Sequence, residues 1–168
     1  MRDLAPMTLA DFASAPFVFS ARTQLAASAD AIFDELGDQS LWFPMMRRSV
    51  WRTGATGGVG AKREVDMLGF GKFREDMLVW DHGRRCAFTM IGTTSPLVTR
   101  MAEDWQIAPA AHGCEIAWTV AAHPSLVGRP IMPALRLILR GMFGMARSGL
   151  AKRTAWSKAA VSRAEGRA

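Results

Sequence analysis

The chain has 168 residues, of which 49% are hydrophobic and 21% charged, and its 21 Lys and Arg against 15 Asp and Glu give a net charge of +6. These proportions are typical of a globular protein, and they exclude a disordered tail, a collagen-like fibre and a disulfide scaffold. A chain of this length buries about 70% of its unfolded surface on folding, so we expect one domain, residues 1–168, with its own core.

The chain contains two cysteines, Cys86 and Cys114, each in a strand-like stretch. This predicts buried, reduced thiols and a cytoplasmic protein. Residues 13–15 have the small-x-small form of a signal-peptide cleavage site, but acidic residues and a proline interrupt the stretch before them. Residues 1–15 are therefore predicted to be a loosely ordered arm. Arginines break the most hydrophobic segment, near the C-terminus, so no membrane span is predicted.

The first elements are a strand and two short helices. Residues 17–25 alternate between apolar and polar side chains, which predicts a half-buried strand. Ser28 is placed to cap a helix with an apolar stripe at Ile32, Phe33 and Leu36, and Gly37 is placed to end it. A second short helix is expected to begin at Asp38 or Ser40 and to end near Pro44.

A run of strands follows, expected over residues 49–53, 61–68, 72–81, 85–94, 98–107 and 114–122. The links between them are short, so neighbouring strands should pair antiparallel. The glycine-rich segment 54–60 lacks the Lys-Ser/Thr ending of a phosphate loop and any following helix, so we interpret it as a hairpin turn, with a possible role as a lid.

A long helix is predicted over residues 133–160. Its apolar side carries Leu135, Ile138, Leu139, Met142, Met145, Ala146 and Gly149, and a neighbouring stripe carries Arg136, Arg140, Arg147 and Lys158. Glycines at 141, 144 and 149 each cost about 1 kcal/mol of helix propensity. We expect this cost to be offset by close approach of the helix to another element.

The predicted order is α+β: a strand, two short helices, about six antiparallel strands and a long helix. Only the last helix is long enough to cover the concave face of a curved sheet, an arrangement that usually leaves a cavity. The segments 27–33, 41–44, 79–85 and 105–118, with the final helix, resemble the START-like (SRPBCC) superfamily and its polyketide cyclase/dehydrase-like group. The resemblance spans residues 17 to about 158. It implies a helix-grip fold, a sheet of about seven strands around the C-terminal helix, and a deep cavity for a lipid, polyketide or other hydrophobic molecule, and it implies no shared catalytic residue.

The predicted cavity lining consists of large apolar side chains and two carboxylates. These candidate ligand-binding residues are Trp42, Phe43, Met67, Glu75, Met77, Phe88, Met90, Glu103, Trp105, Trp118, Met142 and Met145. Three residues are candidates for acid/base chemistry. Glu75 shares a strand face with Phe73, Met77 and Val79, whereas the alternative register turns Arg74, Asp76, Leu78 and Trp80 inward instead. Glu103 shares a face with Trp105, and His123 follows near the expected rim as a possible proton shuttle. Burial would raise the pKa of either carboxyl group and suit it to proton transfer or to anchoring a ligand.

The remaining expectations concern partners. The histidines His82, His112 and His123 lack metal-ligand spacing to the cysteines, so neither a metal nor a cofactor is predicted. The aromatic residues lie mostly outside the basic final helix, which argues against nucleic-acid binding. The leading hypothesis is a protein that binds a small hydrophobic molecule between sheet and helix. The alternatives are a cyclase, aromatase or dehydratase and a peripheral lipid-transfer protein that contacts anionic membrane surfaces through the basic stripe. Both a monomer and a homodimer are compatible with the sequence.

Overall fold

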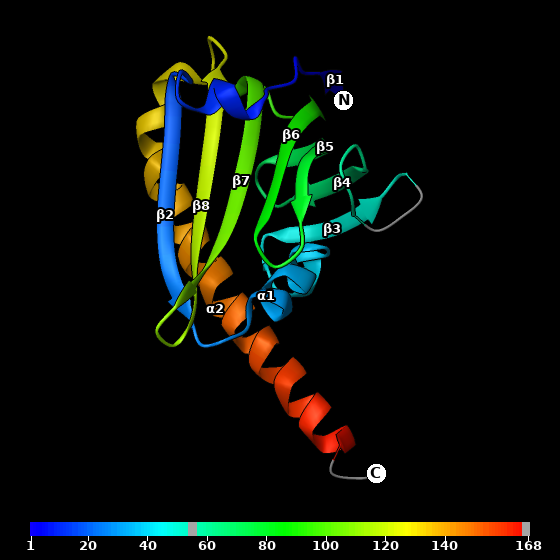
Figure 1. Ribbon diagram of the computed structural model, residues 1–168. Coiled ribbons are helices and arrows are strands. Elements are labelled where there is room, and N and C mark those ends of the chain that lie inside the picture. The colour runs from blue at the N-terminus through cyan, green and yellow to red at the C-terminus, as the bar shows by residue number, and fades with distance from the viewer. Residues whose placement is uncertain (54–56, 166–168) are drawn as a thin grey trace.

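A computed structural model describes residues 1–53 and 57–165 of the chain, and side chains as far as residue 155 (Figure 1). One sheet holds the strands β1 (Arg2–Asp3), β2 (Phe17–Leu25), β3 (Met46–Trp51), β4 (Lys62–Met67), β5 (Gly71–Asp81), β6 (Arg85–Thr93), β7 (Val98–Ala110) and β8 (Gly113–Pro124). Its order is β2-β8-β7-β6-β5-β4-β3, with every pairing antiparallel, and β1 pairs with the end of β6. The predicted meander is confirmed, and part of the expected turn at 54–60 lies outside the described residues.

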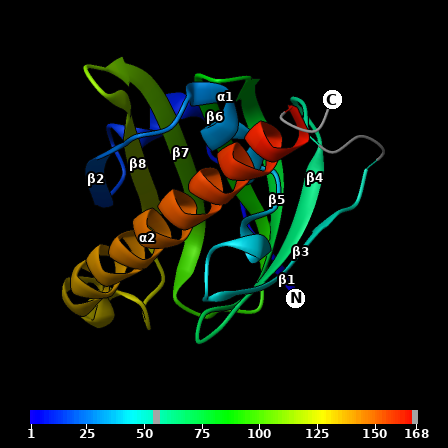
Figure 2. The ribbon, with the colours of Figure 1, turned by 90° about the horizontal axis from the view of Figure 1, so that it is seen from below.

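The helices are η1 (Leu9–Phe12), α1 (Ala29–Leu36), η2 (Gln39–Leu41), η3 (Arg129–Ile131) and α2 (Met132–Glu165). The Ser28 hydroxyl accepts a hydrogen bond from the Ala31 amide, and Asp38 caps η2, as the sequence predicts. Figure 2 shows α2 lying diagonally across the sheet. This arrangement is the predicted helix-grip fold. Among the described helices, none is long and apolar enough to cross a membrane.

The core lies between the concave face of the sheet and α2. The buried side of the helix carries Leu135, Leu139, Met142, Phe143, Ala146 and Leu150. Ile138 and Met145 were expected on this side, but both are exposed. The buried stripe repeats at three- and four-residue steps, and these two side chains fall just outside it.

The N-terminal residues differ from the expected loose arm. Leu4 and Met7 are buried, β1 pairs with β6, and the Met7 amide donates to the Thr89 hydroxyl at 2.8 Å. Met7 packs with Ala102 and Ala121. These alanines face away from α2, and Figure 1 shows η1 crossing in front of β7 and β8 while α2 passes behind them. The small side chains of β7 and β8 leave room for the arm on the convex face.

The three helix glycines have different surroundings. A Cβ atom at Gly149 would collide with the Trp42 carbonyl, so this glycine permits the expected close approach. At Gly141 and Gly144 a Cβ atom would meet nothing within 4 Å among the described atoms. The expectation is therefore confirmed at one glycine and wrong at the other two.

Candidate functional site

Two adjoining cavities lie between the sheet and α2. The upper cavity, of about 50 Å³, reaches toward the β6–β7 turn and is lined by Phe17, Met67, Phe70, Phe73, Met90, Ser95, Leu97, Val98, Met101, Glu103, Trp118, Val120, Ala122, Leu135, Leu139 and Met142. The lower cavity, of about 20 Å³, is lined by Gln39, Trp42, Phe43, Met46, Met67, Glu75, Phe88, Glu103, Trp105, Trp118, Met142 and Ala146. Four residues line both: Met67, Glu103, Trp118 and Met142. The two spaces are therefore parts of one site.

The structure brings most of the predicted ligand-binding residues to these cavities, with two exceptions. Met77 is buried in the packed core and lines neither cavity. Met145 lies on the exposed side of α2. Gln39 is a lining residue that the sequence analysis missed, because a glutamine in a short polar helix is ordinarily exposed.

Glu75 faces inward, which decides between the two registers left open by the sequence. Phe73, Glu75 and Met77 are buried on one face of β5 as predicted. A bulge between Met77 and Val79 then shifts the alternation. As a result Trp80, not Val79, packs on α1, with its ring centroid 5.0 Å from that of Phe33.

Glu75 has a buried cationic partner. Arg63 Nε donates to Glu75 Oε2 at 2.6 Å, and both side chains are almost completely buried. Arg63 Nη1 also donates to the carbonyl of Leu36, at the C-terminal end of α1, where a cation is favourable. Burial raises the pKa of Glu75, and the charge of Arg63 opposes this rise. This ion pair joins the sheet to α1 at the end of the lower cavity.

Glu103 has a different environment. Trp118 Nε1 donates to Glu103 Oε2 at 2.8 Å, and this is the single hydrogen bond that the described residues give to the carboxyl group. Burial raises its pKa to about 7, the negative charge of Glu75 adds to the rise, and the Trp118 N–H opposes it. Protein surrounds the Glu103 carboxyl group. The Glu103 side chain is half-buried, and it lines both cavities. A carboxyl group in this position can exchange a proton near neutral pH.

Aromatic rings hold Glu103 in place. Trp105 and Trp118 stack with ring centroids 5.2 Å apart, and Trp118 stacks in turn on Phe143 of α2 at 6.0 Å. Trp42 meets the edge of Trp105 at 6.5 Å. Trp105 Nε1 lies close enough to Glu103 to help lower its pKa, but it is buried without a hydrogen-bond partner among the described residues.

His123 is not part of the site. It lines neither cavity, whereas its neighbour Ala122 lines the upper one, so the His123 side chain belongs to the opposite face of β8. Cys86 and Cys114 are buried free thiols, as predicted, and burial raises the pKa of Cys86 to about 12. In the part of the chain that the structure describes, no cluster of His, Cys, Asp or Glu is arranged to hold a metal ion.

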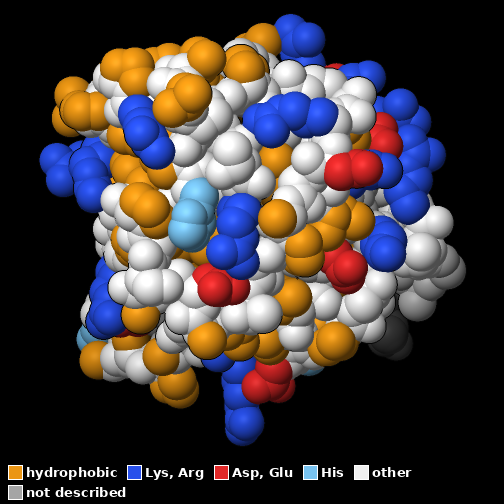
Figure 3. All heavy atoms as spheres, turned by 90° about the horizontal axis from the view of Figure 1, so that it is seen from above, with side chains coloured by type: hydrophobic (Ala, Val, Ile, Leu, Met, Phe, Trp, Pro, Cys, Tyr) orange, Lys and Arg blue, Asp and Glu red, His pale blue; other side chains and the backbone are white. Residues whose placement is uncertain are grey.

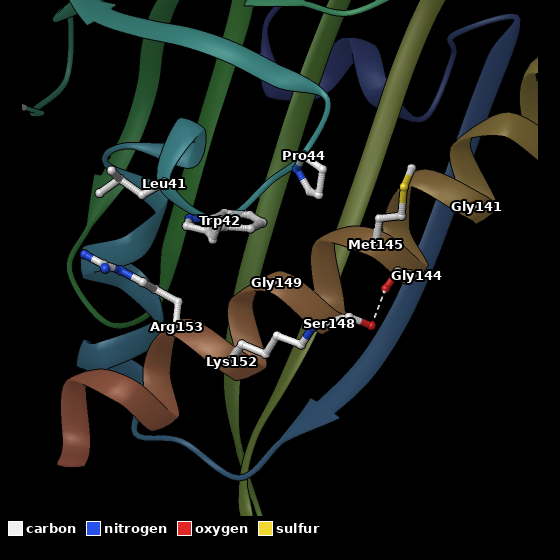
Figure 4. A pocket seen from close by; sticks show the side chains of 10 residues that line it. All are labelled: Leu41, Trp42, Pro44, Gly141, Gly144, Met145, Ser148, Gly149, Lys152 and Arg153. Atoms are coloured by element: carbon white, nitrogen blue, oxygen red, sulfur yellow. Dashed lines mark hydrogen bonds between the residues drawn. The ribbon is translucent and has the colours of Figure 1, made fainter.

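A larger hollow lies on the outside of α2. This groove has a volume of about 690 Å³. It lies between the exposed side of α2 and the segment formed by η2 and the following loop, and Figure 4 shows Met145 and Lys152 projecting from the helix there. Trp42 lines both the groove and the lower cavity, and its indole N–H donates to the Glu35 carbonyl at 2.6 Å. Trp42 thus forms a fixed wall between the two spaces.

The interior cavities are smaller than a ligand. Sites for drug-sized molecules measure about 300–1,000 Å³, so binding requires side chains to move. The lining of the upper cavity includes Met67, Met90, Met101 and Met142. Methionine is unbranched and adapts its shape at low cost. These side chains can enlarge the space without changing the fold.

The comparisons with known proteins agree with this architecture. A protein of Mycobacterium tuberculosis described as uncharacterised is 29% identical over 140 residues, covering 77% of this chain and 84% of the relative. A START superfamily protein from Mycobacterium smegmatis superposes with a TM-score of 0.68 at 14% identity, over 83% of this chain and 97% of its own. A protein from Thermobifida fusca superposes with a TM-score of 0.64 at 22% identity, over 82% and 92% of the two chains. The sequence profile of one family matches residues 16–154. With that match and the START-like fold, the chain belongs to the polyketide cyclase/dehydrase and lipid transport family.

Proposed function

We propose that this protein binds a small hydrophobic molecule between the sheet and α2. The observation that carries the proposal is the pair of cavities beneath the helix, whose walls are apolar apart from a few polar groups that include Glu75 and Glu103. Burial of apolar ligand surface would supply the affinity, at about 25 cal/mol per Å². The family to which the chain belongs is consistent with this function.

The first test is native mass spectrometry of the purified protein, with extraction of the molecules that co-purify. The second is titration with the neutral fluorescent probe N-phenyl-1-naphthylamine. Ala122→Leu adds three carbons to the wall of the upper cavity and should weaken probe binding severalfold. The matched control is Met145→Trp, which enlarges a side chain in the outer groove and should leave binding unchanged. The reverse result would place the ligand in the groove, and the absence of binding to the parent protein would contradict the proposal.

An enzyme of the cyclase, aromatase or dehydratase kind is a second candidate, favoured by Glu103. A carboxyl group with a pKa of about 7 is suited to accept and return a proton at neutral pH. Glu103→Gln keeps an oxygen for the Trp118 N–H but cannot transfer a proton. If this activity exists, the variant should bind the substrate and lose turnover, and full turnover by the variant would exclude Glu103 as the acid/base group.

Lipid transfer is a third candidate, favoured by an exposed apolar tip between β8 and α2. Leu126 is 80% and Val127 59% exposed, and Arg129 follows them. The Ser125 amide donates to the carbonyl of Leu97, which lines the upper cavity, so the tip is attached near the cavity. Figure 3 shows hydrophobic and basic side chains interspersed on this end of the molecule.

Sedimentation with liposomes tests this candidate. Binding should require anionic lipid, weaken with salt and fall with Leu126→Asp. The control is Val59→Asp, which changes an equally exposed apolar residue in the β3–β4 turn and should leave sedimentation unchanged. Absent or salt-insensitive sedimentation would exclude the basic contact with the membrane.

A further inference from the structure

The charged groups at the cavity walls restrict the chemistry of a ligand. Among the residues that line the two cavities, Glu75 and Glu103 are acidic and none is Lys or Arg. Arg63 offsets the charge of Glu75 but does not line either cavity. A carboxylate or phosphate on the ligand would therefore lose its water and meet a second negative charge, with no cation in the wall to receive it.

Glu103 presents a carboxyl group to both cavities. Trp118 donates to one carboxyl oxygen of Glu103, and the residues that line the cavities around it are mostly apolar. When Glu103 is protonated, its O–H is a donor in apolar surroundings, and an unsatisfied buried donor costs about 1–3 kcal/mol. Trp105 Nε1 is a second unsatisfied donor beside it. An oxygen atom on a ligand could accept a hydrogen bond from either donor.

We propose that the ligand is an apolar molecule that carries one uncharged oxygen-bearing group, a hydroxyl or a carbonyl, and that this group forms a hydrogen bond with Glu103. A carbonyl accepts from the protonated carboxyl group, and a hydroxyl can both accept and donate. This inference rests on the proposed binding function and adds the polarity and charge of the ligand. It favours alcohols, ketones and aldehydes over fatty acids.

The groups around Glu103 allow the ionisation state to be assigned. Glu75 from β5 raises its pKa and Arg63 from β4 lowers it. From β6, Cys86 is a thiol whose pKa of about 12 keeps it neutral at pH 8. The other residues that line the lower cavity from β6, η2 and α2 do not titrate; they are Phe88, Gln39, Met142 and Ala146. The charge of the site near neutral pH therefore depends on Glu103 and on the Glu75–Arg63 ion pair.

The experiment compares 1-dodecanol with dodecanoate, which share a chain length and differ in the charge of the head group. Each is titrated against bound N-phenyl-1-naphthylamine at pH 6 and pH 8. At pH 8 the alcohol should displace the probe at a concentration at least about tenfold lower than the acid does. Glu103→Gln should reduce the ratio between the concentrations of acid and alcohol that displace the probe. Glu115→Gln, near the exposed end of β8, should leave this ratio unchanged.

The outcomes separate the two proposals. If dodecanoate binds as tightly as dodecanol at pH 8, or more tightly, the inference about the ligand is wrong, although probe binding still supports the proposed function. If the parent protein binds neither the probe nor either compound, the proposed function fails and the inference fails with it. The comparison of the two compounds uses the parent protein, so it does not depend on whether the variants fold.

Discussion

The two ends of the space beneath α2 are built differently. At the lower end, polar contacts fix the elements: Arg63 pairs with Glu75 and reaches α1, Arg153 of α2 pairs with Glu35 of α1 at 3.0 Å, and Gly149 brings α2 against the Trp42 carbonyl. Toward the upper end the walls are mainly methionine, leucine and aromatic side chains without directional partners. Directional contacts keep one geometry, whereas apolar packing tolerates rearrangement. We therefore expect the lower end to keep its geometry and the upper end to rearrange more easily.

The two carboxylates illustrate the same difference. Both lie beneath α2, but Glu75 forms an ion pair with a guanidinium, whereas Glu103 accepts a hydrogen bond from the Trp118 indole and forms no ion pair among the described residues. The ion pair serves the structure, since Arg63 bonds to Glu75 and to the carbonyl of Leu36 at the end of α1. Glu103 keeps the capacity to change its charge, and the proposed contact with a ligand is therefore assigned to it.

The largest expected effect comes from breaking the ion pair. Arg63→Met leaves Glu75 buried without a cation and should lower the free energy of unfolding by about 3–5 kcal/mol at pH 7. Adding Glu75→Leu removes the uncompensated charge and should restore most of this loss. Urea denaturation of the single and double variants measures both effects. Equal destabilisation of the two would show that the charges are not coupled and that the lower end is held by packing alone.

The sequence predicts the lower end less well than the overall fold. Alternation and turn residues predicted the strands and the antiparallel pairing of successive ones, and the cap at Ser28 predicted α1, because these features depend on local spacing. The pairing of β2 with β8, which are far apart in the sequence, was not predicted. Arg63 was missed, although it shares a strand face with Val65, since an arginine inside a core is explained only by the partner that the fold brings to it. The bulge after Met77 likewise moved Trp80 inward against the alternation.

Glu103 was a candidate because it alternates with Trp105, and the structure places it in both cavities. The absence of Lys and Arg from the residues that line the two cavities could not be predicted, because it depends on every element around Glu103. The burial of the N-terminal arm was also missed, since it depends on the small side chains of β7 and β8 meeting Met7.

The next largest effect should be a dependence of stability on pH that belongs to Glu103. Its pKa rises from 4.5 in the unfolded chain to about 7 in the folded one, so the folded protein holds this proton more tightly. The contribution of this proton to the free energy of unfolding is fully present below pH 4.5 and is lost as the pH rises through about 7. The loss amounts to up to about 3 kcal/mol.

Glu103→Gln removes this pH-dependent contribution to the free energy of unfolding, because an amide does not ionise. Compared with the parent protein, the variant should be the more stable one at pH 8, and the difference should shrink toward pH 5. Chemical denaturation at several pH values measures it, with Glu115→Gln as the exposed control. A pH profile unchanged by Glu103→Gln would mean that Glu103 ionises like an exposed carboxyl group, which would remove the contrast with Glu75.

The smallest effects concern two helix glycines and test how closely α2 is held against Trp42, with the exposed Gly144 as the reference for Gly149. Gly144→Ala meets open space, so it should stabilise the protein by about 0.5–1 kcal/mol through helix propensity. Gly149→Ala gains the same propensity but forces its Cβ atom into the Trp42 carbonyl, and we expect a net loss of about 1–3 kcal/mol from the displaced backbone. Urea denaturation of this matched pair gives the sign of each change. If both substitutions stabilise the protein equally, α2 lies farther from Trp42 than the structure shows, and this contact does not hold the lower end.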